Sequence, residues 1–176
     1  MTVYAQLTQF LEGVNDVTSR WNLRKCLLPL WDRSSSCPMN GAGLVIHGAA
    51  STVAKTGASD CYLIANGVLR KIAAATDMPA LAGTVVNATF NVFCFFIDAG
   101  GTVTSIMGIA GTTLALVKFP QFPTSKALVG FLVINPTGTG SFVGGTTALD
   151  DGTVVPNTAY VSPTGTFDPN TLIGAT

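Results

Sequence analysis

Ionisable side chains are scarce in this sequence. Its 176 residues include one histidine (His47), one glutamate (Glu12) and only 10% charged residues, with a net charge of zero. Acid–base catalysis, metal binding and phosphate binding all need such side chains in pairs or clusters. The scarcity favours a protein that works through surface contact and assembly, and we expect neither an enzyme nor a cofactor.

Motifs that carry catalysis are missing as well. The sequence has no Gly-x-Ser-x-Gly, no His-Glu-x-x-His and no phosphate-binding loop, and nothing near His47 supplies a catalytic partner. Asp150 and Asp151 before Gly152 resemble a fragment of a calcium loop. The EF-hand spacing and its closing glutamate are absent, so we expect a turn there. We predict no catalytic and no metal-binding residues.

Long apolar runs are also lacking. The most apolar run, residues 90–97, has eight residues, whereas a membrane-spanning helix needs about 20. The first residues show no basic region followed by an apolar core, so we expect no secretory leader and no membrane partner. The hydrophobic fraction is nevertheless 48%. We expect this apolar surface to be buried partly in a core and partly against other chains.

The few cations are unevenly placed. Seven of the nine lie in the first 71 residues. Two interpretations stay open: solvated surface charges, or docking of the N-terminal part on an acidic protein surface. No basic patch is interleaved with aromatic residues, so we expect no nucleic-acid partner.

Cysteine spacing excludes the common zinc motifs. Cys26, Cys37, Cys61 and Cys94 form no Cys-x-x-Cys pair and have no histidine at zinc spacing. We therefore expect reduced thiols in a cytoplasmic environment, with Cys94 as a small core residue inside its apolar run.

An apolar stripe marks the N-terminal segment, residues 1–33. Apolar residues recur there at alternating steps of three and four, the spacing of a helix with one apolar face. Two interpretations stay open: the helix lies on its own domain, or it joins copies of the chain in a short parallel coiled coil. The candidate oligomerisation or anchoring residues are Leu7, Phe10, Val14, Val17, Trp21 and, beside Pro29, Trp31.

The remaining sequence is β in character. We predict a linker at residues 34–43, a β domain at 44–153 and an extended C-terminal arm at 154–176 that adds to a neighbouring chain. Asn66-Gly67 between β-prone runs predicts a hairpin with a type I′ turn.

Other runs complete the β prediction. Residues 90–97 and 102–107 predict a second hairpin, 114–119 a strand, and 127–134 a central strand buried on both faces. The predicted fold class is mainly β: an antiparallel β-sandwich or barrel with an N-terminal helical segment and an extended C-terminal arm.

One resemblance covers residues 61–167, about three fifths of the chain. It lies in the texture and turn placement of four stretches: residues 62–71 (YLIANGVLRK), 91–95 (NVFCF), 129–140 (VGFLVINPTGTG) and 142–150 (FVGGTTALD). These stretches resemble a recurrent domain of virion proteins of tailed bacteriophages, in particular capsid decoration (cement) or head-fibre proteins.

That resemblance implies a small β-rich structural protein of the virion, assembled in the host cytoplasm. The implied activity is decoration and stabilisation of the capsid through subunit–subunit contacts. The implied partners are the major capsid protein or other virion proteins and further copies of this chain, with a homotrimer favoured. It implies no catalytic residues.

Two other functional classes stay open. One is a host-surface module of a tail or head fibre that binds a glycan or receptor; Tyr62 and Tyr160 are the tyrosines of the β region, and both tryptophans lie outside it. The other is a particle-borne depolymerase, which needs two carboxylates across the scissile bond. Its candidates are Asp60, Asp77, Asp98, Asp150, Asp151 and Asp168.

Overall fold

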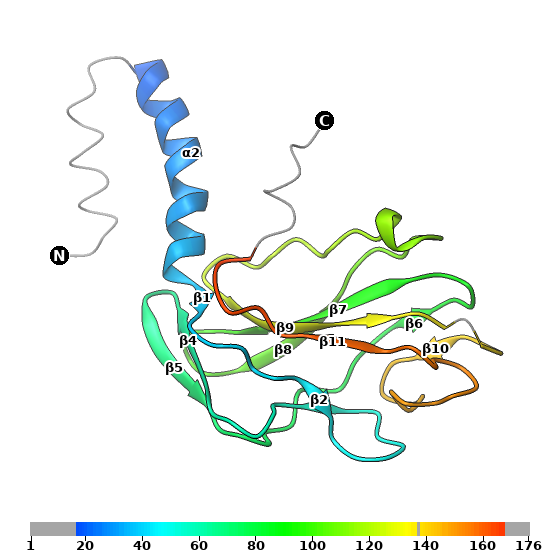
Figure 1. The fold of residues 1–176 in the computed structure, drawn as a ribbon. Coiled ribbons are helices and arrows are strands. Elements are labelled where there is room, and N and C mark those ends of the chain that lie inside the picture. The colour runs from blue at the N-terminus through cyan, green and yellow to red at the C-terminus, as the bar shows by residue number, and fades with distance from the viewer. Residues whose placement is uncertain (1–16, 137, 168–176) are drawn as a thin grey trace.

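The computed structural model describes residues 17–136 and 138–167; within its helix, the side chains at positions 20, 26 and 29–33 are not described. The described chain is mainly β, with several antiparallel sheets and one N-terminal helix. Figure 1 shows this helix standing away from a layered β domain. None of the described sheets closes into a barrel, so the barrel alternative is not realised.

The elements follow one another as a helix and then short strands. In chain order they are α2 (Val17–Ser35), β1 (Cys37–Pro38), β2 (Val45–Ile46), β3 (Ala54–Lys55), β4 (Cys61–Ala65), β5 (Val68–Ile72), β6 (Thr84–Val85), β7 (Asn91–Ile97), β8 (Val103–Met107), the 3-10 helix η1 (Leu114–Leu116), β9 (Ala127–Ile134), β10 (Phe142–Val143) and β11 (Ala159–Val161).

A four-stranded antiparallel sheet in the order β11-β9-β7-β8 is the centre of the domain. Every residue of β7 is buried, and β9 is buried along nearly all of its length. A continuous apolar run suits a strand covered on both faces, because neither set of alternating side chains then meets water. The predicted central strand at 127–134 and the predicted hairpin of β7 with β8 are both confirmed.

A β-bulge in β9 shifts the alternation of its side chains. Phe95 pairs with Gly130 while Phe96 pairs with Leu128, so one extra residue lies between them. Glycine is required at the bulge because a Cβ on Gly130 would lie 2.6 Å from Leu44 Cδ1. The bulge thus lets a neighbouring segment pack directly on the sheet backbone.

One face of the central sheet is covered by three small sheets: β1-β4-β5, β2-β3 and β6-β10. The core between these layers takes alternate residues of β7, including Phe93 and Phe95. Phe142 of β10 meets Phe93 edge to face, with ring centroids 6.0 Å apart. This face has the packing of one layer of a β-sandwich on the other.

Among the described residues, irregular chain and not a second sheet covers the opposite face. Val92, Cys94 and Phe96 of β7 face a cluster completed by Phe122 and Phe131. Most aromatic pairs in this cluster meet edge to face, and the centroids of Phe96 and Phe122 are 4.9 Å apart. Such pairs add specific geometry to apolar burial, which helps to hold a segment that forms no ladder.

The Asn66-Gly67 hairpin is confirmed. Strands β4 and β5 pair from Cys61↔Ile72 to Ala65↔Val68. Asn66 and Gly67 have φ values of 50° and 77°, the left-handed values that a type I′ turn demands at both central positions.

The predicted strand at 114–119 is wrong. Leu114–Leu116 forms η1 instead, and Lys118 makes only an isolated bridge to Ile109. The chain folds back tightly over Gly111, where a Cβ would lie 2.5 Å from the Leu116 carbonyl carbon. Close backbone packing at this glycine overrides the β propensity of the leucines and valine.

The predicted linker and the predicted C-terminal arm each contribute a strand to a sheet. Within the predicted linker at 34–43, β1 pairs with β4, so residues 37–38 form the edge of a sheet. Within the predicted arm at 154–176, β11 pairs with β9, and the Phe167 ring stacks on Phe131. Backbone pairing inside the chain holds both segments; residues 168–176 lie outside the described residues.

Candidate functional site

Helix α2 presents the described part of the predicted apolar stripe to solvent. Val17 is 75% exposed and Trp21 57% exposed, and the helix rises from the β domain near β1 (Figure 1). Neither side chain therefore packs on the β domain of its own chain. Among the other predicted positions, Leu7, Phe10 and Val14 lie outside the described residues, and the side chain of Trp31 is not described.

Helix α2 continues beyond the last residue of the predicted stripe, Trp21. It includes Pro29 and ends at Ser35, although proline lacks the N–H that would donate to the carbonyl four residues earlier. The three-four spacing from Val17 and Trp21 reaches Leu28 after passing Arg24. A charged residue at one position of an apolar seam weakens self-association but can fix its register.

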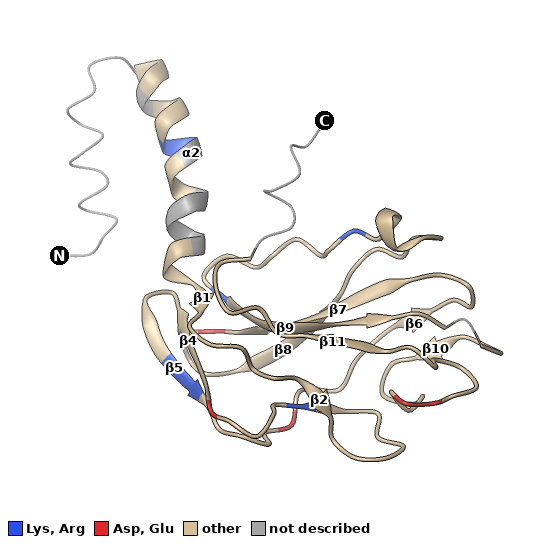
Figure 2. Ribbon diagram, in the orientation of Figure 1, with Lys and Arg blue, Asp and Glu red and all other residues tan. Residues whose placement is uncertain are grey.

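The helix that carries the exposed tryptophan is rich in cationic residues. Helix α2 has four cationic residues against one acidic residue, Asp32, and no acidic residue in its first described turn. The Lys25 ammonium lies 5.0 Å from the centroid of the Trp21 ring, within the range of a cation–π interaction. Figure 2 shows that the remaining charges occupy short, separate stretches of the β domain.

A second apolar surface, the η1 turn, was not found from the sequence. Ile109, Leu114 and Leu116 are each more than half exposed at its tip, and residues 108–117 include no charged residue. The β propensity of residues 114–119 predicted a strand. The tight turn over Gly111 brings these side chains outward instead.

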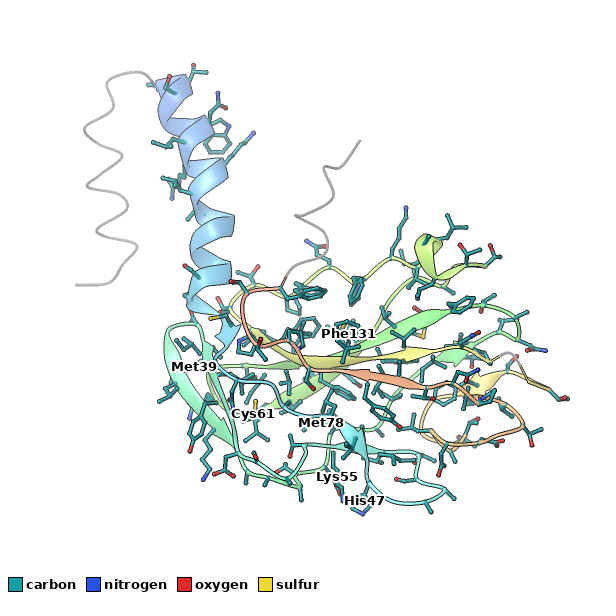
Figure 3. The ribbon with its side chains drawn as sticks, in the orientation of Figure 1. Met39, His47, Lys55, Cys61, Met78 and Phe131 are labelled. Carbon is teal, nitrogen blue, oxygen red and sulfur yellow. The ribbon has the colours of Figure 1, made fainter. Side chains whose placement is uncertain are left out.

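His47 has a partner that its sequence neighbourhood did not reveal. Its Nδ1 lies 2.5 Å from Asp77 Oδ1, 30 residues further along the chain. Both side chains are more than half exposed, and Figure 3 places His47 with Lys55 at the outer edge of the β domain. This geometry joins one imidazole to one carboxylate at the surface of the described β domain.

The described aspartates of the β domain serve turns and surface pairs. Asp151 Oδ1 accepts hydrogen bonds from the N–H groups of Thr153 and Val154, so the predicted turn after residue 150 is present. The Lys71 ammonium, 2.6 Å from Asp60, lowers the pKa of that carboxyl. Among the described residues, no group of three or more metal-ligating side chains lies together.

The thiols of the core have low reactivity. Cys61 and Cys94 are fully buried, and burial raises their thiol pKa to about 11 and about 12. A thiol in this state is almost wholly protonated at neutral pH and is therefore a poor nucleophile. The prediction that Cys94 is a core residue is confirmed, and the described cysteines Cys37, Cys61 and Cys94 are unbridged.

No protein-family model, no curated protein and no solved structure matches this chain. Among the described residues, none of the helical segments has the length and apolar character to cross a bilayer. The physical features of the chain therefore carry the functional argument. The candidate functional site is the exposed face of α2 with Val17, Trp21 and Lys25.

Proposed function

We propose that this chain is a structural subunit of a tailed-phage virion that decorates and stabilises the capsid through subunit–subunit contacts. The observation that carries this proposal is helix α2, which leaves Val17 and Trp21 in solvent beside a β domain with its own buried apolar clusters. Exposed aromatic residues away from a core are typical of protein interfaces. The resemblance of residues 61–167 to phage virion proteins supplies the biological setting.

The α2 helices of several copies pack together in this proposal, with a trimer favoured. A closed ring covers the apolar stripe of every copy at once, whereas an open arrangement leaves one stripe exposed. Arg24 then lies in the seam between Trp21 and Leu28, where it limits the alignments that the helices can adopt. The β domains remain free to contact the major capsid protein or other virion proteins.

Solution mass tests the self-association step. Light scattering on the purified full chain is expected to give about three times the 18.1 kDa subunit mass. Trp21→Asp is expected to reduce the mass toward that of a monomer while the β-sheet circular dichroism stays unchanged. Leu116→Asp is a matched control, because Leu116 is 59% exposed and Trp21 57%; its mass should equal that of the wild type.

Capsid binding tests the virion role separately. Sedimentation of the chain with phage capsids that lack it is expected to bring the wild type into the pellet. A monomeric wild type would contradict the oligomer, and a chain that stays in the supernatant would contradict decoration. Binding to a host glycan without binding to capsids would favour the fibre module, for which Tyr62 is the one large exposed aromatic of the described β domain.

A further inference from the structure

Two Asn-Gly dipeptides occur in the sequence, Asn40-Gly41 and Asn66-Gly67. At such a pair the backbone nitrogen of glycine can attack the asparagine side-chain carbonyl carbon, because glycine has no Cβ to shield that nitrogen. The attack forms a five-membered succinimide and expels ammonia. Water then opens the ring to aspartate or isoaspartate, so the net reaction consumes one water and releases one ammonia.

The side chain of Asn40 is held on both of its polar atoms. Its Nδ2 donates to the Asp60 carbonyl at 2.9 Å, and its Oδ1 accepts from the Tyr62 N–H at 2.6 Å. Both contacts are with the region that begins β4, so the carboxamide cannot turn toward the Gly41 nitrogen without breaking them. Asn40 is therefore protected as long as β4 keeps its place.

Asn66 is held in a different way. Asn66 and Gly67 are exposed at the tip of the hairpin, and a Cβ on Gly67 would meet nothing within 4 Å. The constraint acts on the backbone: the Gly67 N–H donates to the carbonyl of Ser35 at 2.8 Å. The Asn66 N–H donates to Ser36 Oγ at 2.9 Å. The acceptors are the last residue of α2 and the residue that follows it.

We propose that Asn66 is a site of spontaneous deamidation and that its contact with the end of helix α2 sets the rate. While Gly67 N–H donates to Ser35, the attacking nitrogen is occupied and the turn keeps its type I′ shape. When α2 moves away from the hairpin, the nitrogen is released and water already surrounds the site. We call these two hydrogen bonds, from Gly67 to Ser35 and from Asn66 to Ser36, the joint between α2 and the β domain. The joint thus controls the reaction.

The deamidated product in turn changes the contact between α2 and the hairpin. Deamidation replaces a neutral amide by a carboxylate at the C-terminal end of α2, where the helix dipole is negative. The like charges repel, and an isoaspartate also lengthens the main chain in the tightest part of the turn. Both effects weaken the contact of α2 with the hairpin, so modification makes the joint looser.

The two asparagines provide an internal comparison. Native protein is incubated in mildly alkaline buffer, and the peptides that contain each site are followed by mass spectrometry and by an isoaspartate assay. Conversion is expected at Asn66 and not at Asn40, whereas both should convert in urea. No conversion at Asn66 in the native protein, or equal conversion at both sites, would overturn the proposal.

Ser36→Ala tests the control by the helix joint. Loss of the hydrogen bond to Asn66 N–H is expected to speed conversion at Asn66 about fivefold, the factor that one lost hydrogen bond implies. The rate at Asn40 should not change. Ser51→Ala is the matched control, because the Ser51 hydroxyl is hydrogen-bonded to the Val53 backbone; equal acceleration in the two variants would contradict the joint mechanism.

Ser36→Thr keeps a hydroxyl at the joint and is expected to retain the slow rate, while circular dichroism checks that each variant folds. If Ser36→Ala does not fold, the comparison of Asn66 with Asn40 in the wild type and in Ser36→Thr still decides the proposal. A fast rate in a folded Ser36→Thr protein would count against a role for the hydroxyl.

Discussion

Strand β7 and helix α2 use apolar residues in opposite ways. All seven residues of β7 are buried, because the strand is paired on both edges and covered on both faces. Val17 and Trp21 of α2 remain largely exposed, because no described layer of the chain covers that part of the helix. The neighbouring strands and layers that cover an element, and not its apolar content, therefore determine its role. A covered element stabilises the fold, and an uncovered one stays available for assembly.

Removing an aromatic ring from β7 is expected to have the largest effect on the stability of the fold. Phe93→Ala is expected to lower the free energy of unfolding by about 4 kcal/mol, because the side chain is fully buried and leaves a cavity between two layers. Urea unfolding followed by far-ultraviolet circular dichroism measures the loss. Tyr62→Ala removes a 40% exposed aromatic side chain and should cost much less; equal losses would refute the buried role of Phe93.

Adding a methyl group to the central sheet is expected to lower the free energy of unfolding less than removing an aromatic ring from it. Gly130→Ala introduces a Cβ only 2.6 Å from Leu44 Cδ1 and 2.7 Å from the Val161 carbonyl oxygen, and a loss of about 2 kcal/mol is expected. The same urea titration applies. Gly152→Ala is the control, because a Cβ there would meet nothing within 4 Å; it should leave the midpoint in place.

Acid should weaken the β7–β8 turn through Asp98. Its Oδ1 accepts the N–H groups of Gly100 and Thr102, both at 2.9 Å, and the Thr102 bond is the first cause of its lowered pKa. Because the folded pKa lies below the usual 3.8, this stabilisation is fully present above pH 3.8 and is lost as the pH falls through the folded value.

Asp98→Ala tests that linkage. The variant should unfold more easily at neutral pH and should lack the part of the acid dependence that the carboxyl provides. Thermal unfolding between neutral and strongly acidic pH compares the two proteins. Parallel stability curves would show that Asp98 is not the group that responds to acid.

The smallest effect is expected on the helix. Trp21→Ala should change the free energy of unfolding of the β domain by less than about 0.5 kcal/mol, since the side chain is mostly exposed. The measurement is made at a concentration where the chain is monomeric, so that loss of self-association does not enter. A loss as large as that of Phe93→Ala would show that α2 packs on its own domain.

Local signals in the sequence predicted much of the fold. Asn66-Gly67 identified its hairpin because few residues other than asparagine and glycine readily take positive φ at both central positions. The run at 127–134 identified a central strand because continuous apolar character suits burial on two faces. The register shift at Gly130 left no such mark, since it depends on where Leu44 packs.

The candidate surface was predicted only in part. The spacing of Val17 and Trp21 indicated an apolar helix face, and the two side chains are exposed. The strand prediction for residues 114–119 is wrong, because Leu114 and Leu116 have the composition of a strand. The close backbone approach at Gly111 cannot be recognised from composition. Self-association through α2 stays a prediction.

The sequence by itself determined the class of the fold, the positions of its tight turns and the poverty of reactive groups, because each depends on residue type or short spacing. Only the tertiary structure decided that β1 and β11 belong to sheets, that His47 meets Asp77, and that α2 ends against Asn66 and Gly67. These contacts join residues about 25 to 32 positions apart along the chain. Their formation depends on the packing of whole layers, which short-range sequence patterns do not encode.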